Sequence, residues 1–217
     1  MMVICIYGCG GLGRETAELI KIVNANKRWD NIIFIEDNPS KQFVNDISVY
    51  GTKDLLTYFN KEDIEVVIAV GEPAVREKMK NNILSMGLKL ATIIHPEIIV
   101  PKTTIICDGV VINQGCYLSC NVEIKSNVFL QQSVIIGHDT KINENTLLSA
   151  HSFVGGNCVL GKNTYIGPNS SIKEAIIVGD NCIVGMGSMV FKDIPNTMTV
   201  LGNPARIIAK NNDGKVF

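Results

Sequence analysis

The chain contains 217 residues, of which 46% are hydrophobic and 19% are charged, so it has enough apolar side chains for at least one ordinary core. Its formal net charge of −1 argues against a surface that binds nucleic acid or an anionic membrane. The apolar run Val3–Tyr7 is far too short to cross a bilayer and leads directly into glycines, which excludes a signal-peptide core, so we expect a cytoplasmic protein.

Cysteine and histidine are poorly arranged for metal binding. The seven cysteines include no CxxC pair, and the histidines are only His95, His138 and His151. We therefore expect reduced cysteines and no metal site.

Residues 1–92 alternate strand-like and helix-like segments. Short apolar runs predict strands at residues 3–7, 32–35 and 66–70, and the spacing of apolar residues predicts helices at 14–26, 54–59 and 73–86. This alternation predicts an α/β domain, a small Rossmann-like βαβ unit with a parallel sheet.

A glycine-rich loop, residues 8–13, lies between the first strand and the first helix. Its backbone amides and the helix N-terminus favour phosphate, while the end of the second strand is where a ribose or base lies. Arg76 and Glu72, near the end of the third strand, are expected to close over a diphosphate. The predicted nucleotide contacts of this domain are Gly8, Gly10, Gly11, Gly13, Glu36, Asp37 and Gly71.

The GxGxxG pattern of this loop is not specific to one ligand. It also marks nicotinamide dinucleotide sites, and tight packing of a helix on a strand requires glycines without any ligand. Only about 90 residues precede the repeat described next, about half of a dinucleotide fold, which favours a mononucleotide diphosphate.

After this region the sequence follows a strict six-residue period. Every sixth position from Ile106 to Val190 is Ile, Leu or Val, fifteen in all, and Val100 and Ile94 extend the phase backwards. Each hexapeptide is one short strand and a corner, three hexapeptides make one triangular coil, and coils stack about 4.8 Å apart. The sequence therefore predicts a parallel β-helix with a C-terminal cap over residues 93–217, after a first domain at 1–92.

The repeat places His138 and Gly156 in one vertical column. Both take the third place of their hexapeptides, one coil apart, with Cys120 below and Glu174 above. A histidine that accepts a proton beside a bare amide that receives a negative oxygen suits acyl transfer. Cys120 has no evident base partner, so we do not favour it as a nucleophile.

The other two histidines have simpler interpretations. His151 lies on another edge of the prism and is expected to face solvent unless a neighbouring subunit brings it near His138. His95, before Pro96, lies at the joint between the domains, and we expect an interdomain hydrogen bond there.

Together these features resemble the nucleotide-amino-sugar N-acetyltransferases of bacterial glycan synthesis and their sialic acid O-acetyltransferase relatives. The resemblance runs from Ile6 to Arg206, and its most specific parts are the unbroken repeat, the triplet Gly137-His138-Asp139 and the pair Gly156-Asn157. It implies a left-handed β-helix, a homotrimer with active sites between subunits, acetyl-CoA as cosubstrate, and a UDP- or dTDP-linked amino sugar as acceptor.

The resemblance also implies residue roles. His138 resembles the family's general base, Asp139 the carboxylate that orients it, and Gly156 the amide that binds the acetyl oxygen. The closing segment Gly202-Asn-Pro-Ala-Arg206 resembles a coenzyme A tunnel lining, although capping of the β-helix explains it equally. The predicted acetyl-CoA contacts besides Gly156 are Pro168, Gly185, Met186, Gly187 and Arg206.

Three positions depart from the family pattern. Gly137 stands where relatives often carry an acid, Gln131 where many carry Asn, and Leu147 where a second histidine falls. We expect all three around the acceptor pocket, with Gln131 contacting the nucleotide sugar. The predicted function is direct N-acetylation in a ternary complex. The alternatives are O-acetylation of sialic acid or another sugar, a non-catalytic partner in sugar biosynthesis, and a nicotinamide sensor.

Overall fold

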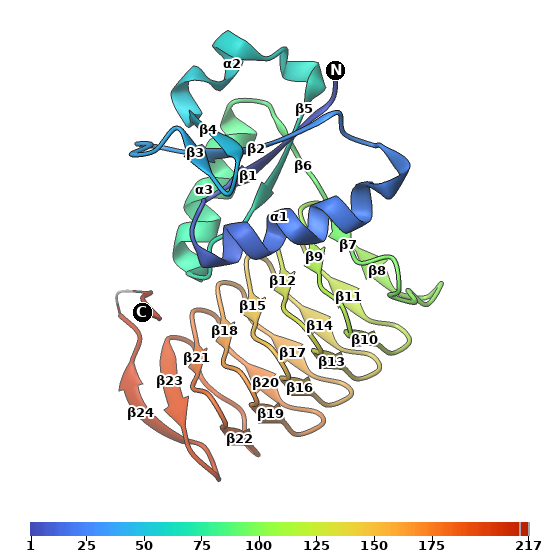
Figure 1. The fold of residues 1–217 in the computed structure, drawn as a ribbon. Coiled ribbons are helices and arrows are strands. Elements are labelled where there is room, and N and C mark those ends of the chain that lie inside the picture. Colours follow the sequence, from blue (N-terminus) through green and yellow to red (C-terminus); the bar gives the residue numbers. More distant parts are fainter. Residues whose placement is uncertain (213, 217) are drawn as a thin grey trace.

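A computed structural model of the protein describes residues 1–212 and 214–216. An α/β part formed by about the first two fifths of the chain lies against a long triangular stack of short strands formed by the rest (Figure 1). This architecture confirms the predicted fold class, a Rossmann-like α/β unit followed by a left-handed parallel β-helix.

The α/β part is built on one six-stranded sheet with strand order β3-β4-β2-β1-β5-β6. All its pairings are parallel except the hairpin of β3 and β4. Side chains of β1 alternate between two cores, so that Ile4 and Ile6 pack under α1 while Val3 and Cys5 pack under α3. The elements are β1 (Val3–Tyr7), α1 (Gly11–Val23), β2 (Asn31–Glu36), β3 (Phe43–Val44), β4 (Ile47–Gly51), α2 (Leu55–Tyr58), β5 (Ile64–Ile68), α3 (Pro73–Ser85) and β6 (Lys89–Leu90), with short 3-10 helices at Asn24–Asn26, Thr52–Asp54 and Lys61–Asp63.

Several boundaries in this part differ from the sequence-based ones. The first helix begins at Gly11 rather than residue 14, because the glycine loop itself enters the helix, and the third strand ends at Ile68 rather than residue 70. The hairpin of β3 and β4 was not predicted. Its strands are short, and its turn signal is the pair Asn45 and Asp46, both with positive φ, as a tight hairpin requires.

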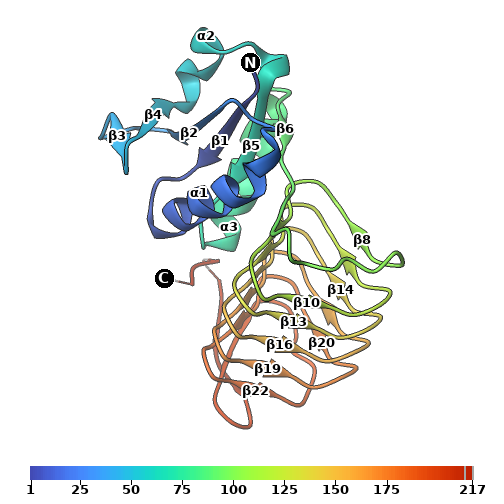
Figure 2. The same ribbon diagram turned by 45° about the vertical axis from the view of Figure 1, so that its right-hand side comes forward.

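The β-helix has three flat faces made of two-residue strands, which stack coil on coil in Figures 1 and 2. The strands of the first face are β7 (Ile93–Ile94), β9 (Val111–Ile112), β12 (Phe129–Leu130), β15 (Leu147–Leu148), β18 (Tyr165–Ile166) and β21 (Ile183–Val184). Those of the second are β10 (Tyr117–Leu118), β13 (Ile135–Ile136), β16 (Phe153–Val154), β19 (Ser171–Ile172) and β22 (Met189–Val190). Those of the third are β8 (Ile105–Ile106), β11 (Glu123–Ile124), β14 (Lys141–Ile142), β17 (Val159–Leu160) and β20 (Ile177–Val178).

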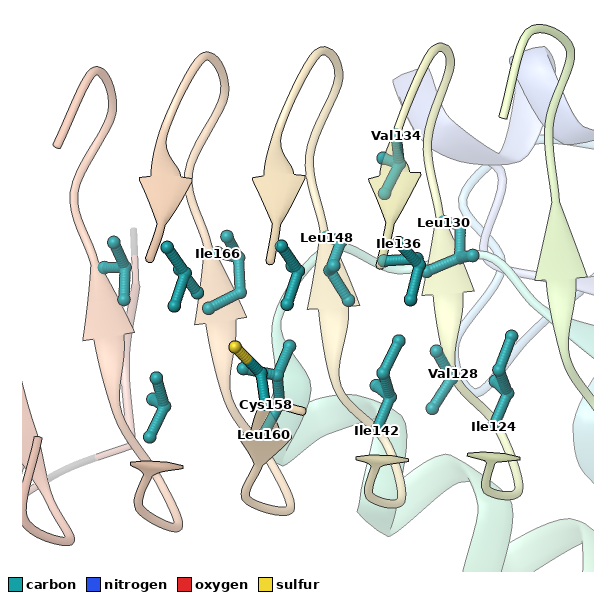
Figure 3. Packing of buried hydrophobic residues seen from close by; sticks show 14 of the residues in the cluster. Ile124, Val128, Leu130, Val134, Ile136, Ile142, Leu148, Cys158, Leu160 and Ile166 are labelled. Carbon is teal, nitrogen blue, oxygen red and sulfur yellow. The ribbon is translucent and has the colours of Figure 1, made fainter. Parts of the chain in front are cut away.

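The register matches the six-residue period. Ile136 pairs with Val154 and Ile142 with Leu160, eighteen residues apart, and these anchors point into the prism. Figure 3 shows the resulting rows of inward side chains, one per coil, with the sulfur of Cys158 among them. A fully buried anchor such as Ile142 contributes about 2–5 kcal/mol relative to alanine.

The corners show a regularity that was not predicted from the sequence. The fourth residue of every hexapeptide from Gly109 to Gly187 has a positive φ, between 55° and 76°. Most of these residues are Asn, Asp or Gly, the types that adopt the left-handed conformation most readily. This repeated left-handed residue turns the chain from one face to the next.

One extension of the repeat was wrong. Val100 keeps the sequence phase, but it is 37% exposed and belongs to no strand. The expected partner strand, β10, is the first of its sheet. Strands β7 and β8 are also terminal and still form, but Val100 is followed by Pro101, which has no N–H to donate to β10 as Ser119 donates to Ile136 O one coil later.

The two parts are joined along the first face, which we call the covered face. Its outward side chains Val111, Phe129, Leu147 and Tyr165 pack against α1 in one apolar cluster, and Figure 1 shows α1 lying beside β9, β12 and β15. At the far end β23 (Met198–Leu201) continues this sheet and β24 (Arg206–Lys210) pairs with it antiparallel. Among the described residues, no helix is long and apolar enough to cross a membrane.

Candidate active site

His138 lies at the corner between β13 and β14, where the second face meets the third. We call the column Cys120, His138, Gly156 and Glu174 the His138 edge. The imidazole is about half exposed, and its Nδ1 lies 2.8 Å from Asp139 Oδ2. Asp139 takes the left-handed position, with φ 57°, which turns its carboxylate back toward the histidine.

Asp139 is held on both sides. Its other oxygen, Oδ1, accepts a hydrogen bond from Asn121 Nδ2 at 2.9 Å, and Asn121 lies in the same place one coil below. This hydrogen bond, and next that of His138, lower the pKa of the Asp139 carboxyl, so it stays ionised. An ionised carboxylate accepts only, so it selects the tautomer with hydrogen on Nδ1 and leaves Nε2 as an acceptor. Asn121 was not predicted as a site residue, although its eighteen-residue spacing from Asp139 identifies it.

Gly156 lies directly beside the imidazole. A Cβ added to Gly156 would be 2.6 Å from His138 Nε2 and 2.7 Å from Cε1, so only glycine fits under this ring position. In the described part of the chain, the Gly156 N–H has no hydrogen-bond partner. The structure therefore brings together a proton acceptor and an unoccupied amide donor.

Gly137 has a structural reason to depart from the family pattern. A Cβ at Gly137 would overlap the Gly156 nitrogen. An acidic side chain in this backbone conformation would therefore press on the amide, while glycine leaves it uncovered.

The glycine loop forms the wall of a cavity of about 540 Å³ at the carboxyl ends of β1, β2 and β5. Gly10 and Gly11 have open space where a Cβ would stand, so packing does not explain them. Gly13 is different, because its Cβ would overlap Gly8 O, and it serves the packing of α1 on β1. Six of the seven nucleotide contacts predicted in this domain line the cavity: Gly8, Gly10, Gly11, Glu36, Asp37 and Gly71.

The two acids of this cavity already have partners. Asp37 Oδ1 accepts hydrogen bonds from the Tyr7 hydroxyl and, at 3.1 Å, from Thr52. Glu36 Oε1 accepts one from the Cys9 thiol at 2.8 Å. Burial, and then this bond to Glu36, raise the pKa of Cys9 to about 11, so the thiol stays protonated.

Two further cavities adjoin this one. One, of about 540 Å³, shares Cys9, Gly10 and Glu36 with it and adds Arg14 and Lys41, two cations beside the start of α1. The other, of about 470 Å³, shares Asp37 and Asn38 and is otherwise lined by polar and flexible side chains: Thr52, Lys53, Asn82 and Met86. Arg14 and Lys41 were not predicted as contacts, although both lie within four residues of predicted ones.

Two expected acceptor-site residues are buried elsewhere. Arg76 is fully buried between β5 and Asn127 of the β-helix rather than over a diphosphate. Leu147 is 1% exposed and packs against α1 on the covered face, so it is not part of an acceptor pocket. A histidine there would place a polar ring in the core that joins the two parts.

Several predicted residues lie on another edge, between the covered and second faces. We call this column, Gln132, Ala150, Pro168 and Met186, the Pro168 edge. Gln131 lies beside it, and its Oε1 accepts a hydrogen bond from Ala150 N at 3.1 Å, away from both the His138 edge and the nucleotide cavity. Further residues there are Gly185, Gly187 and His151.

The coenzyme candidates on this edge differ in exposure. Met186 is 69% exposed, and Gly187 has open space around its Cα. Gly185 packs closely on Leu201, where a Cβ would approach to 2.5 Å. Within one chain these residues do not meet His138.

Arg206 lies instead at the end of the stack. Together with Lys192 and Ala205 it lines a cavity of about 400 Å³. Lys192 follows β22 at the last corner of the His138 edge, where the coil is two residues shorter because Ile194 pairs with Val178, and Asp193 lines the same cavity. Lys192 was not predicted as a contact because the apolar period ends at Val190.

The second face carries an exposed apolar stripe between the two edges. The outward residues Tyr117, Ile135 and Phe153 of three successive coils are 60%, 41% and 42% exposed. No cluster of His, Cys, Asp and Glu side chains that could hold a metal ion occurs among the described residues.

His95 is buried near the joint between the two parts. Its backbone N–H donates to Ile112 O, and its Nδ1 accepts a hydrogen bond from Glu97 N at 3.3 Å. Both partners belong to the β-helix part, so the expected interdomain bond does not form among the residues that the structure describes.

Comparisons with known proteins agree with this architecture. Residues 3–83 match the PglD N-terminal domain, and residues 157–192 match the bacterial transferase hexapeptide repeats. WeeI from Acinetobacter baumannii AYE is 26% identical, with a TM-score of 0.89 over 96% of this chain and all of that one. The acetyltransferase domain of PglB from Neisseria gonorrhoeae FA1090, in complex with acetyl coenzyme A, is 27% identical, with a TM-score of 0.67 over 95% of this chain and 98% of that one.

A curated relative is the GDP-perosamine N-acetyltransferase of Escherichia coli O157:H7, 30% identical over 130 residues. The match covers 55% of this chain and 54% of the relative, about half the relative's length. The fold and site thus define a hexapeptide-repeat β-helix protein with a PglD-type N-terminal domain. In this architecture the chain is similar to the nucleotide-sugar N-acetyltransferases of which this relative is one.

Proposed function

We propose that this protein is an acetyl-CoA-dependent N-acetyltransferase that acts on the amino group of a nucleotide-linked amino sugar. The observation that carries the proposal is the position of the His138 ring beside Gly156, where an added Cβ would stand 2.6 Å from Nε2, with Nδ1 fixed by Asp139. A proton acceptor and a free amide donor on one open edge are the two groups that acyl transfer to an amine requires.

The reaction is a direct transfer in a ternary complex. The sugar amine attacks the thioester carbonyl of acetyl-CoA, and His138 Nε2 takes the proton that the nitrogen loses. The Gly156 N–H donates a hydrogen bond to the negative oxygen of the tetrahedral intermediate. When the intermediate collapses, the carbon–sulfur bond breaks, the amide remains on the sugar, and coenzyme A leaves with the proton from His138.

Acetyl-CoA lies along the His138 edge. Lys192, about 14 Å or three coils from His138, and Arg206 supply positive charge for its phosphates at the end of the stack and outnumber Asp193 in the same cavity. The pantetheine arm then runs toward Gly156. A relative of the same fold is described in complex with acetyl coenzyme A, which supports this donor.

The nucleotide sugar binds in the N-terminal cavity. Gly10 and Gly11 admit the diphosphate to the start of α1, and Arg14 and Lys41 neutralise its charge. The curated relative is named for a GDP-linked sugar, so GDP joins the expected UDP and dTDP as candidate nucleotides.

The complete site needs more than one copy of the chain. The N-terminal part sits on the covered face, and the His138 edge is the edge opposite that face, so one chain cannot bring its own cavity to its own histidine. The apolar stripe of Tyr117, Ile135 and Phe153 supplies a surface for a second copy, which would also bring a Pro168 edge toward His138. We therefore propose a homotrimer with sites between subunits, residues 1–92 binding the nucleotide sugar and 93–217 the acetyl donor.

A thiol-release assay with acetyl-CoA and a panel of UDP-, dTDP- and GDP-linked amino sugars tests the proposal. We expect turnover with at least one nucleotide amino sugar and acetylation of its nitrogen, read by mass spectrometry. Acetylation of a hydroxyl on a free sugar, or no turnover with any member of the panel, would contradict it.

A further inference from the structure

Arg76 is a buried cation with no acidic partner among the described residues. Its side chain is fully buried, and no carboxylate lies within ion-pair distance of it in the described chain. Burial lowers the pKa of the guanidinium to about 9, which still leaves it charged near neutral pH. Its Nε has no hydrogen-bond partner in the part of the chain that the structure describes.

The remaining donors of Arg76 join the two parts of the molecule. Nη1 donates to Ile68 O at 2.9 Å and Val70 O at 3.1 Å, at the end of β5 where Val70 lines the nucleotide cavity. Nη2 donates to Asn127 O at 2.6 Å and to Asn127 Oδ1 at 2.9 Å. The guanidinium also lies over the ring of Phe129, 5.3 Å from its centre.

Asn127 also donates a hydrogen bond back to Arg76. Its Nδ2 donates to Arg76 O at 3.2 Å and to Asn145 Oδ1 at 3.0 Å. The amides continue as a ladder, from Asn145 to Asn163 at 2.8 Å and from Asn163 to Asn181 at 3.3 Å. We call these four residues the Asn ladder, which forms the edge between the third and covered faces.

Helix α3 therefore forms hydrogen bonds with the Asn ladder at two of its residues. Arg76 holds Asn127, and the next residue, Glu77, accepts a hydrogen bond from Asn163 Nδ2 at 3.0 Å. Asn127 and Asn163 are two coils, or about 10 Å, apart. Two polar contacts at this separation fix the direction of α3 along the β-helix, which the apolar packing of α1 alone does not do.

Stability alone is a poor explanation for this arrangement. Well-packed apolar residues usually replace a buried charge with neutral or favourable effect on the free energy of unfolding. A buried nitrogen left without a partner adds a further cost. An apolar side chain, however, cannot bind four oxygens from both parts of the molecule at once.

We propose that Arg76 is a positioning residue that fixes the nucleotide-cavity wall at Val70 to the Asn ladder, and so sets where the bound sugar's amine is presented. The consequence for catalysis rests on the proposed function. The contact between cavity wall and ladder does not.

Two variants test this. Arg76→Lys keeps the positive charge but loses the two Nη groups that bind both parts of the molecule. Asn127→Ala removes the side-chain oxygen that accepts a hydrogen bond from Nη2. Lys78→Met is the matched control, because it removes an exposed cation two residues away on the same helix. For each protein, calorimetry gives the affinity for UDP and GDP, steady-state kinetics give kcat and KM for the best nucleotide amino sugar, and thermal melting gives the folded fraction.

We expect kcat to fall about 10–100-fold in Arg76→Lys and Asn127→Ala, because the amine is misplaced, while nucleotide affinity changes less than about threefold. Lys78→Met should behave as the parent protein. Unchanged kcat in both variants, or losses of kcat and affinity that simply follow the folded fraction, would overturn the proposal.

Hydrogen exchange on the unliganded protein provides the readout that needs no substrate. We expect amides of residues 68–72 to exchange faster in both variants but not in Lys78→Met. If the parent protein acetylates no nucleotide amino sugar, the proposed function fails while this measurement still tests the contact. Equal exchange in all four proteins would overturn the contact itself.

Discussion

The β-helix and the N-terminal domain place their functional residues in different ways. In the β-helix the eighteen-residue register places them: His138 meets Gly156, and Asn121 meets Asp139, because the members of each pair lie eighteen residues apart. In the N-terminal domain, local geometry places the functional residues, since the glycines of one loop and the ends of three strands form the cavity. The repeat thus determines the spacing of chemical groups, whereas the loops determine the shape of a binding site.

The largest effect is expected in the repeat. His138→Ala removes the proton acceptor and should lower kcat about 10²–10⁴-fold, with only a modest change in acetyl-CoA affinity. Steady-state kinetics and calorimetry with acetyl-CoA measure the two effects separately. Cys120→Ser, in the same column one coil below, is the control and should keep near-normal turnover. Near-normal turnover of His138→Ala would remove the mechanism.

Gly156→Ala tests the same contact by changing the residue beside the imidazole. The new methyl would lie 2.6 Å from His138 Nε2, so the ring must move away from the amide. We expect kcat to fall about 10²-fold, because the displaced ring no longer lies in line with the reacting amine, although the amide N–H is kept. Acetyl-CoA affinity and melting temperature should change little. Full activity in this variant would mean that the position of the ring beside Gly156 is not required.

A smaller effect is expected in the loop-built site. Gly10 has φ −69° and nothing within 4 Å of the position that a Cβ would take, so Gly10→Val should fold normally but fill the nucleotide cavity. Calorimetry should show about 10–100-fold weaker binding of the preferred nucleotide, with unchanged acetyl-CoA binding. Gly13→Ala is the contrast, because its methyl would overlap Gly8 O and should lower the melting temperature instead. Unaltered nucleotide affinity in Gly10→Val would place the nucleotide elsewhere.

The smallest expected effect is a difference in alkylation rate between two cysteines, one in each region. With a pKa raised to about 11, Cys9 has on the order of one thiolate per thousand molecules at pH 8. Exposed Cys120 should therefore react with iodoacetamide well before Cys9, as peptide mass spectrometry would measure. UDP or GDP should protect Cys9, whereas Cys120, one coil beyond His138 on the side away from the proposed acetyl-CoA, should react at the same rate with and without either nucleotide. Protection of Cys120 but not of Cys9 by the nucleotide would place the nucleotide site elsewhere.

Sequence could predict the repeat further than the loops because a strict period constrains every coil at once. The anchors from Ile106 to Val190, their faces and the column of His138 and Gly156 all follow from counting. The left-handed corner residues could also have been predicted from the sequence, since Asn recurs at the fourth place of the hexapeptides. Val100 fails at the end of the stack, where the apolar period continues but Pro101 lacks the N–H that a strand there needs.

Contacts between the two parts could not be predicted in this way. Leu147 and Arg76 are buried because the N-terminal part sits on one particular face, and no spacing within either part determines that face. Gly10 and Gly13 belong to one motif, yet the first faces a cavity and the second a neighbouring carbonyl. Only the packed structure separates these two roles.

The most direct test is a crystal structure with a bisubstrate analogue, in which the sulfur of coenzyme A is joined through an acetyl unit to the amine of the preferred nucleotide sugar. We predict that the acetyl oxygen lies about 3 Å from Gly156 N and the amine nitrogen about 3 Å from His138 Nε2. We also predict that the nucleotide lies in the cavity of a different subunit. An analogue bound with its acetyl unit away from the His138 edge would contradict the mechanism.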